Sequence, residues 1–446
     1  MFEVINNRGK PLSELEKIKN YFIYYATIKK QKILKSKVNN TWGKILKYLS
    51  LAKITSNQDE NSYLRNCYIV FFSPHKSNSW NVYKELRNKY PPENEEDIND
   101  KITEITNFIN FILQAAQSYA YLFRKSRFEQ EYQGEYQKEV AITLRRLRSQ
   151  QAFASILPLF LAAMVKFHSS PKEVSELLII LEKLNFRIYG LPNRKIRRAD
   201  SRQGHLFWCA HRFYWGGEIR KKCSMGNFDC LKAELIDFTI RNCSEETFIQ
   251  SLTIEGEDNF NYYSWKGLRY FLGSYEEHLR LQKRETWDIG KILISRNETN
   301  SSNSNDYLSK EHIWAAKNRE SEFPENFKQK RRLGNFVLVG LTSNIQLQNN
   351  DIQIKVKTLL EKNLNSMFQV SRLEKVFTEA VQEHNYDQTY LKFAIHLIDL
   401  RETEFVRFAI DRWKLPTENF IKFNKVDSFE AQRLGQSRNY FLKSDE

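Results

Sequence analysis

One of the chain's eight histidines, His312, directly follows a glutamate in the stretch SKEHIWAAKN. Imidazole exchanges protons near neutral pH, so this side chain can take a proton from water as a general base. Glu311 offers a carboxylate, and Asn335 and Asn344 offer amide groups further along the chain. Carboxylate and amide oxygens are ligands that hard divalent cations prefer. Residues of these types suit a hydrolysis in which a cation neutralises developing negative charge.

The spacing of these residues predicts the elements that position them. Glu311 and His312 end a short strand, which follows a flexible Asn- and Ser-rich connector at residues 295–310. Asn335 comes after 22 intervening residues, at the head of a second strand in RRLGNFVLVGLTSN, and Asn344 comes nine positions later near the start of a helix. Because side chains alternate along a strand, we expect Glu311 and His312 to point to opposite faces.

The order of strand, strand and helix, with an acid-His pair, Asn and Asn, closely resembles the HNH (ββα-metal) nucleases. This resemblance implies that His312 is the general base for phosphodiester hydrolysis. It implies that Glu311 and the amide oxygen of Asn344 bind one Mg²⁺ or Mn²⁺ ion, with water and phosphate oxygens completing the shell. Asn335 is expected to tie the intervening loop to the first strand and to orient His312, without binding the metal.

Basic residues in the loop and in the following helix complete the expected site. The loop contains the segment KQKRR, whose side chains can clamp phosphate groups. The family often has a second asparagine inside the helix, as Asn349 or Asn350 could be, and a lysine. One local departure is that Ala315 and Ala316 stand where the family usually has Pro, often followed by Gln. The residues expected to contact DNA here are Lys328, Lys330, Arg331, Arg332 and Lys355.

Three further segments resemble modification-dependent (type IV) restriction enzymes of the GmrSD kind. FEVINNRGKPLSELEKIKN looks like the second conserved block of their ParB-like, nucleotide-dependent N-terminal domain. Gly267–Leu279 looks like the helix that opens their nuclease domain, and Arg401–Trp413 looks like its closing helix. The matching residues in the first segment are Phe2, Asn6, Gly9 and Leu12.

The N-terminal block departs from that family in one respect. The family's preceding Asp-Gly-Gln-Gln-Arg sequence, which serves nucleotide binding and hydrolysis, is absent. Asn6, Arg8 and Gly9 are therefore weak candidates for cofactor binding, and we do not expect this chain alone to hydrolyse a nucleotide. A truncated gene, a start codon placed too late, or a partner chain that supplies the missing lobe would each explain the departure.

The positive charge favours a polyanionic partner, and the alternative is a charged surface that only keeps the chain in solution. The 446 residues carry 69 basic and 54 acidic side chains, a net charge of +15, and 41% of the residues are apolar. A chain of this length and composition builds a sizeable core, and its charge favours nucleic acid. No apolar run reaches the roughly 18 residues that span a bilayer, and no signal peptide is evident, so we expect a cytoplasmic protein without a membrane partner.

The five cysteines are scattered and form no CxxC pair, which favours free thiols in a reducing compartment. The segment HLFWCAH places His205, Cys209 and His211 close together, with Cys223 and Cys230 following. Their irregular spacing favours buried residues over a zinc site. The remaining cysteines are Cys67 and Cys243.

A basic stretch precedes this cysteine-containing segment. NRKIRRADSRQGHLFWCAHRFYWGG combines basic side chains with later aromatic ones. It predicts either a phosphate-binding edge beside a packed helix or a solvated turn before a core helix. Its candidate DNA contacts are Arg194, Arg197 and Arg198.

The pattern as a whole predicts a mainly α chain with a small β component and a C-terminal ββα-metal (HNH) element. Expected segments are a remnant of the ParB-like domain at 1–60, a helical middle region at 61–250, and a nuclease domain with flanking helices at 251–446. At the N-terminus, Ser13 and Glu16 form a capping-box pattern, and Leu15, Ile18, Phe22 and Tyr25 follow helical spacing.

These features favour a metal-dependent DNA endonuclease that acts on foreign or modified DNA in prokaryotic, anti-phage defence. The alternative is a non-catalytic DNA-binding or sensing subunit of a restriction complex, in which the nuclease fold is only a scaffold. An RNA-directed nuclease is less favoured, because most Phe and Tyr residues fall at the spacing of helical core positions rather than on an exposed stacking surface.

Overall fold

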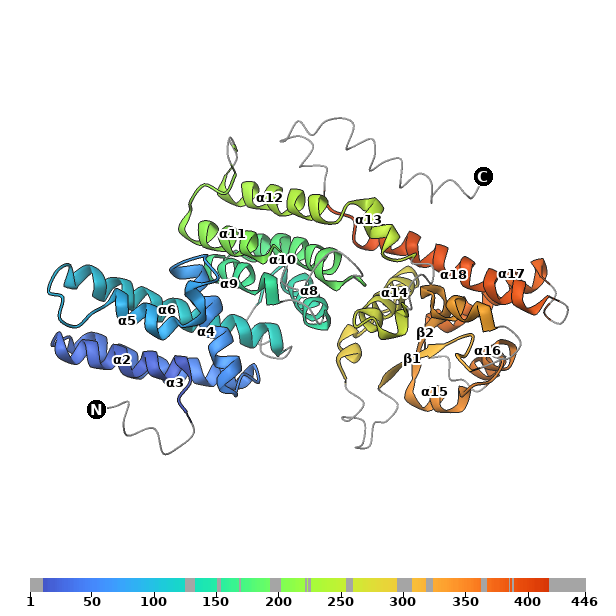
Figure 1. Cartoon of the computed structure of the whole chain (residues 1–446), viewed down its shortest axis with the longest axis horizontal. Coiled ribbons are helices and arrows are strands. Elements are labelled where there is room, and N and C mark those ends of the chain that lie inside the picture. Colours follow the sequence, from blue (N-terminus) through green and yellow to red (C-terminus); the bar gives the residue numbers. More distant parts are fainter. Residues whose placement is uncertain are drawn as a thin grey trace. The chain divides into compact units, whose positions relative to one another are not determined.

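The chain is mainly helical, as the sequence predicts, and the described residues contain one two-stranded sheet (Figure 1). The structure is a computed structural model. It describes residues 11–124, 133–150, 154–167, 170–192, 202–220, 223, 226–253, 260–294, 307–317, 324–361, 367–384, 386 and 389–416. Within these residues, no helix combines the length and apolarity needed to cross a bilayer.

The chain forms two compact units that do not follow the three segments expected from the sequence. Unit 1 comprises residues 1–148, 153–182 and 198–235, and unit 2 comprises 149–152, 183–197 and 236–446. The segment expected as a separate domain at 1–60 therefore belongs to the same unit as most of the helical middle region.

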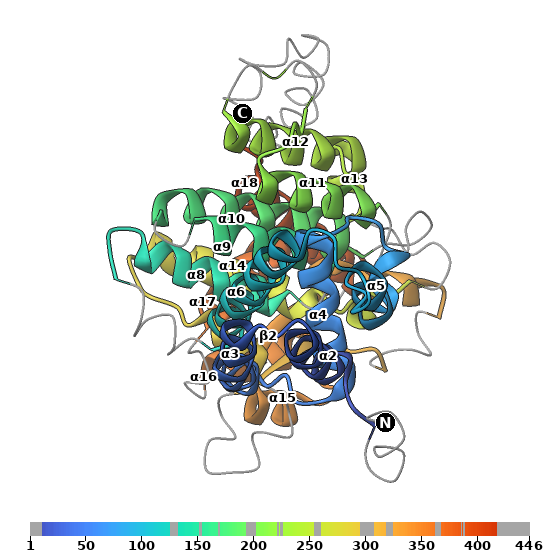
Figure 2. The same ribbon diagram turned by 90° about the vertical axis from the view of Figure 1, so that its left-hand side faces the viewer.

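Unit 1 is built from helices whose apolar faces meet. Helix α2 pairs with α3 and α5, and α3 pairs with α6 (Figure 2). Helix α9 packs on α4, α6 and α11. The helices that lie wholly or mainly in unit 1 are α2 (Glu14–Ile28), α3 (Lys32–Leu51), α4 (Asn57–Phe71), α5 (Val82–Lys89), α6 (Ile98–Phe123), α8 (Gln137–Ser149), α9 (Leu157–Lys166), α10 (Pro171–Asn185), α11 (Gln203–Trp215) and α12 (Asn227–Asn242). The last residues of α8, α10 and α12 belong to unit 2.

Helix α2 shows how the sequence specifies this unit. Ser13 and Glu16 form the expected capping box, in which each side chain bonds the other's free backbone N–H. The four apolar residues expected on one face of the helix are all fully buried. Phe22 lies against Phe108, whose ring also contacts Phe71 at a centroid distance of 5.2 Å. The aromatic side chains of this unit thus contribute to its core.

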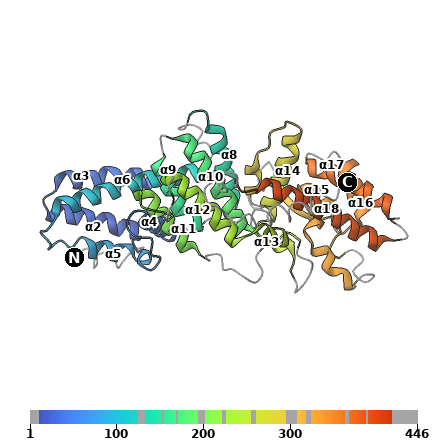
Figure 3. The same ribbon diagram turned by 90° about the horizontal axis from the view of Figure 1, so that it is seen from above.

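Unit 2 surrounds the sheet with helices. The strands are β1 (Leu308–His312) and β2 (Phe336–Gly340), which pair antiparallel with His312 opposite Phe336. Helices α14 and α15 contact both strands, and α17 contacts β2, α16 and α18. Figure 3 shows the helices α14 to α18 of this unit from above. The helices are α13 (Glu245–Gln250), α14 (Leu268–Gln282), α15 (Leu341–Leu347), α16 (Ile352–Glu361), α17 (Phe368–Glu383) and α18 (Tyr390–Arg412).

The helix expected from Asn344 onward is divided into two. Helix α15 ends at Leu347, and Gln348 has a positive φ of 42°, a conformation that an α-helix cannot continue through. Asp351 then precedes α16, which carries Lys355. The break matters for the site because it lets Lys355 approach β1 from a different direction than Asn344.

The cysteines differ in part from the expectation of free thiols. Cys223 and Cys230 form a disulfide, so the expectation was wrong for these two residues. Cys67, Cys209 and Cys243 are buried and are not disulfide-bonded. The His205 ring contacts Cys209 and Glu234, at 3.7 and 2.8 Å, while His211 hydrogen-bonds the Val70 carbonyl.

Candidate functional site

The β1–β2 hairpin and α15 bring the predicted catalytic segment together. Leu308 to His312 pairs with Phe336 to Gly340, so His312 lies at the end of the hairpin where the long connection begins. The backbone N–H of Ile313 donates to the Asn335 carbonyl at 2.9 Å, which extends the pairing by one residue. Helix α15 follows β2 without a loop, and Asn344 lies on its second turn.

Asn335 bridges the chain after β1 and the turn before β2. Its Nδ2 donates to the carbonyls of Trp314 and Lys330, at 3.0 and 2.7 Å, and its Oδ1 accepts from the Trp314 N–H at 2.7 Å. The side chain is fully buried. Three hydrogen bonds from one buried amide fix both ends of the connection that begins directly after His312.

Glu311 is buried against a lysine from α16. The Lys355 ammonium donates to Oε1 of Glu311 and to the His312 carbonyl, the latter at 2.7 Å. Burial raises the pKa of the Glu311 carboxyl, and the ammonium of Lys355 acts in the opposite direction. Burial likewise lowers the pKa of Lys355. The carboxylate therefore needs a positive charge beside it, and in this structure the ammonium supplies that charge.

His312 lies on the opposite face of the strand, as the alternation predicts. Its ring stacks on Tyr263 at a centroid distance of 4.9 Å and contacts Phe336 at 4.8 Å. Burial, followed by the positive charges of Lys355, Lys310 and Lys330, lowers the pKa of His312 to about 4. The imidazole is therefore neutral at pH 7 and able to accept a proton.

Asn344 approaches the strand on the side of Glu311. Its Nδ2 donates to Oγ of Ser309 at 2.7 Å. Ser309 and Glu311 are two residues apart on β1, so their side chains share a face. The structure therefore places Asn344 on the carboxylate's face of the strand. The hydrogen bonds of this region pair Glu311 with Lys355 rather than with Asn344.

The basic residues expected to contact DNA divide into two groups. Lys328 is exposed and Arg331 is half-buried. Lys330 is buried, donates to the Ala316 carbonyl at 3.2 Å and lies over the Trp314 ring. Arg332 pairs with Glu402 and Asp399 on α18. The assignment of Arg332 as a phosphate contact needs correction, because two carboxylates already neutralise its buried guanidinium.

Several expected residues lie outside the described part of the chain. They are Asn6, Arg8 and Gly9 of the N-terminal block, and Arg194, Arg197 and Arg198 of the basic stretch.

Helix α18 supports the turn that carries Asn335, a contact that the sequence analysis missed. Arg401 donates to the carbonyls of Gly334 and Phe336, each at 2.9 Å, and is almost fully buried. A Cβ atom at Gly334 would overlap the Ile398 carbonyl oxygen, so only glycine allows this approach. The available signal was a pair of charged residues, Arg401 and Glu402, on the buried and mostly apolar face of the helix.

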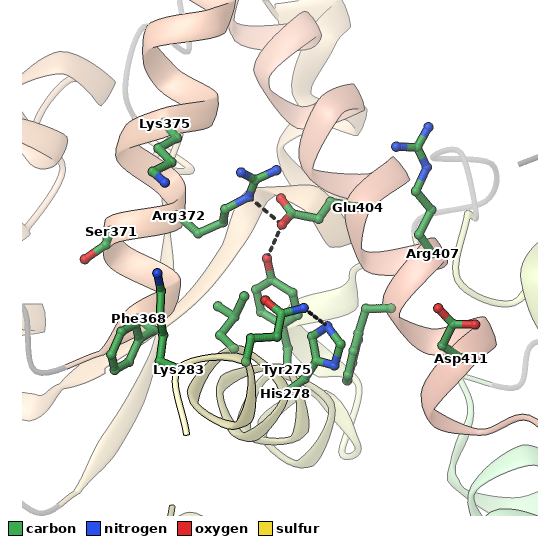
Figure 4. A pocket seen from close by; sticks show the side chains of 13 residues that line it. Tyr275, His278, Lys283, Phe368, Ser371, Arg372, Lys375, Glu404, Arg407 and Asp411 are labelled. Carbon is green, nitrogen blue, oxygen red and sulfur yellow. Dashed lines mark hydrogen bonds and ion pairs between the residues drawn. The ribbon is translucent and has the colours of Figure 1, made fainter. Parts of the chain in front are cut away.

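A cavity of about 680 Å³ lies between α14, α17 and α18 in the same unit (Figure 4). At its wall, Arg372 and the Tyr275 hydroxyl donate to Oε1 of Glu404, at 2.6 and 2.5 Å. Basic side chains outnumber acidic ones, so the lining suits an anionic group. Its charged residues are Lys283, Arg372, Lys375, Arg407, Glu404 and Asp411. This cavity could not be predicted from local sequence patterns, because three separate helices contribute to it.

No protein-family model matches the chain, and no curated protein or solved structure shows a detectable similarity to it.

Proposed function

We propose that the chain is a metal-dependent DNA endonuclease of the HNH type, acting on foreign or modified DNA in prokaryotic, anti-phage defence as a type IV restriction enzyme. The observation that carries this proposal is the β1–β2–α15 arrangement, in which Asn335 fixes the connection that begins after His312. The role in defence rests on the sequence resemblance to the GmrSD kind of enzyme.

In the proposed mechanism, His312 takes a proton from the attacking water. A neutral imidazole is required for this step, and the low pKa of about 4 ensures it at physiological pH. A phosphodiester bound nearby would bring negative charge, which favours the imidazolium form and so raises the pKa toward the working pH. Stacking on Tyr263 and contact with Phe336 fix the plane of the ring.

Glu311 and Asn344 are the proposed ligands for one Mg²⁺ or Mn²⁺ ion. The donor atoms fit a hard cation because they are a carboxylate oxygen and an amide oxygen. Asn344 uses its Nδ2 to bind Ser309, which leaves Oδ1 for a cation on the face of β1 that Glu311 also occupies. A bound ion would neutralise charge on the phosphate and the leaving oxygen. Lys355 would then move from Glu311 toward the substrate's phosphate.

Positive charge supports a DNA substrate. Lys310, Lys330 and Lys355 all lie close enough to His312 to depress its pKa, so the potential at the strand end is positive. The chain carries a net charge of +15. Backbone phosphates are attracted to such a surface whatever the base sequence.

Nicking of a supercoiled plasmid tests the proposal. Purified wild-type protein in Mg²⁺ or Mn²⁺ should nick the DNA, and His312→Ala should abolish nicking while DNA binding is largely retained. His278→Ala is the matched control, since His278 is also a half-buried histidine of unit 2. Undiminished cutting by His312→Ala would rule out the assignment of the base.

The second candidate is a non-catalytic DNA-binding or sensing subunit. The observation that favours it is the Lys355 ammonium, which already satisfies Glu311. A scaffold of this kind would show salt-sensitive DNA binding and no metal-dependent nicking at any nucleotide concentration. Nicking by the purified protein would eliminate this candidate.

A further inference from the structure

Two histidines and a glutamate meet where α17 turns into α18. Glu383 is the last residue of α17, His384 caps that helix, and His396 lies on the second turn of α18. The two helices pack against each other, and both belong to unit 2 (Figure 1). None of the three residues belongs to the β1–β2–α15 site.

The three side chains already lie near metal-binding distances of one another. One potential ligand atom from each falls within 4.8 Å of the other two. Oε2 of Glu383 is 3.0 Å from Nε2 of His396, and the two imidazole rings are perpendicular with centroids 5.1 Å apart. A tetrahedral Zn²⁺ site separates its nitrogen and oxygen ligands by roughly 3.3 Å. Small side-chain rotations would therefore complete the geometry.

His396 provides a second observation that points to a ligand. Its Nε2 is buried, and although Glu383 is close, this nitrogen makes no hydrogen bond of acceptable geometry to the described residues. Buried polar atoms are nearly always satisfied, and an exception at a cluster of ligand-type side chains marks a site for an ion. The side chain of Glu383 is 56% exposed, so an ion can reach the cluster from solvent.

We propose that Glu383, His384 and His396 bind one Zn²⁺ ion, with water in the remaining position. Two imidazole nitrogens and one carboxylate oxygen form a donor set that zinc accepts readily, whereas Mg²⁺ prefers oxygen ligands alone. The carboxylate and two neutral imidazoles neutralise half of the ion's charge.

The ion would join the two helices at their connection. The same connection contacts α16 through Asp351, whose Oδ1 accepts hydrogen bonds from Tyr386 and Tyr390 at 2.6 and 2.8 Å. Helix α18 also carries Arg401, which binds the turn around Gly334. A metal here would therefore stabilise the helical support of the β1–β2 hairpin and take no part in chemistry there.

Calorimetric titration of the chelator-treated full chain with Zn²⁺ tests the proposal. Wild type should bind one equivalent of zinc at this cluster. His384→Ala and His396→Ala should bind that equivalent more than about 100-fold more weakly. Glu383→Gln keeps the side chain's shape on an exposed position and should weaken binding at least about tenfold. Zinc should raise the melting temperature of wild type and not that of His396→Ala.

Two variants serve as controls. His278→Ala removes a histidine of unit 2 outside the cluster, and His211→Ala removes a histidine of unit 1, so both should bind zinc as wild type does. The proposal is overturned if wild type binds no zinc, or if Glu383→Gln and His384→Ala bind it unchanged. Because the readout is binding and not cleavage, its result is independent of the proposed nuclease activity.

Discussion

The two compact units bury different kinds of side chain. In unit 1 the core around α2, α4 and α6 consists of apolar and aromatic residues, such as Phe22, Phe71 and Phe108. In unit 2 the hairpin and its supporting helices bury charge. The side chains there that are at most 9% exposed include Glu311, Lys330, Arg332, Lys355, Arg401 and Glu402.

This difference indicates where chemistry is to be expected. Removing a charge from water costs several kcal/mol, and an apolar replacement of similar volume is often as stable or more so. Unit 1 carries less of that cost, because it buries charge at fewer positions, such as Lys29, Glu182 and Glu234. Charges retained around one strand end, with perturbed pKa values for Glu311, His312 and Lys355, mark a candidate functional site.

The largest expected effect comes from breaking the buried ion pair under the hairpin. Arg332→Ala leaves Glu402 buried without its main positive partner and should lower the free energy of unfolding by about 3–5 kcal/mol. Arg65→Ala in unit 1 is the comparison, because Arg65 donates to Ser79 and covers Trp80 but pairs with no carboxylate of the described residues. Arg65→Ala should lower the free energy of unfolding by about 1 kcal/mol. Urea denaturation measures both.

The double variant Arg332→Met, Glu402→Leu sharpens this comparison. Because both charges are removed, it should recover most of the stability lost in Arg332→Ala. If Arg332→Ala and Arg65→Ala lowered the free energy of unfolding equally, the buried charges of unit 2 would not differ energetically from the arginine of unit 1.

A smaller difference in the free energy of unfolding is expected between alanine variants of two buried asparagines, one in each unit. Asn335→Ala removes three hydrogen bonds and leaves the Trp314 N–H unsatisfied, which should cost about 3 kcal/mol. Asn66→Ala in unit 1 removes one bond with the Tyr119 hydroxyl and should cost about 1 kcal/mol. Denaturant midpoints of the two variants test this order, and a reversed order would show that Asn335 is not central to the turn.

The pH dependence of stability should also differ between the units. His312 has a pKa of about 4 in the folded chain against 6.5 for the free side chain, so the unfolded chain binds more protons between these values. The free energy of unfolding therefore rises with pH through this window, and acidification from pH 7 to 5 should lower it by on the order of 2 kcal/mol.

Comparing the pH profiles of histidine variants with that of wild type isolates the contribution of each imidazole. His312→Asn should remove that part of the pH dependence, because the variant lacks the imidazole, whereas Glu311 and the neighbouring lysines are the same in both proteins. His211→Asn in unit 1 should change it in the same direction but less, since burial lowers the pKa of His211 while its bond to the Val70 carbonyl opposes the shift. An unchanged pH profile in His312→Asn would mean that the imidazole is not held neutral.

Local patterns predicted much of the architecture. The helical class, the capping box at Ser13 and two short strands ending at His312 and beginning after Asn335 follow from side-chain spacing and capping chemistry. The break at Gln348 was missed, because a positive φ at a non-glycine residue leaves no mark in hydrophobic periodicity.

Long-range pairings could not be predicted from the sequence. Arg332 stood in a basic loop and resembled a phosphate contact, but its partners Asp399 and Glu402 lie nearly 70 residues away on α18. Lys355 likewise reaches Glu311 from a separate helix. Charge patterns locate basic residues, whereas only the tertiary structure determines which of them are neutralised internally.

The most direct test of the central claim is the Mg²⁺ dependence of plasmid nicking by wild type and by Glu311→Gln. If Glu311 binds the cation that supports hydrolysis, wild type should nick in a saturable Mg²⁺-dependent manner, and Glu311→Gln should show no nicking at any Mg²⁺ concentration. Nicking by Glu311→Gln with the same Mg²⁺ dependence as wild type would contradict the account.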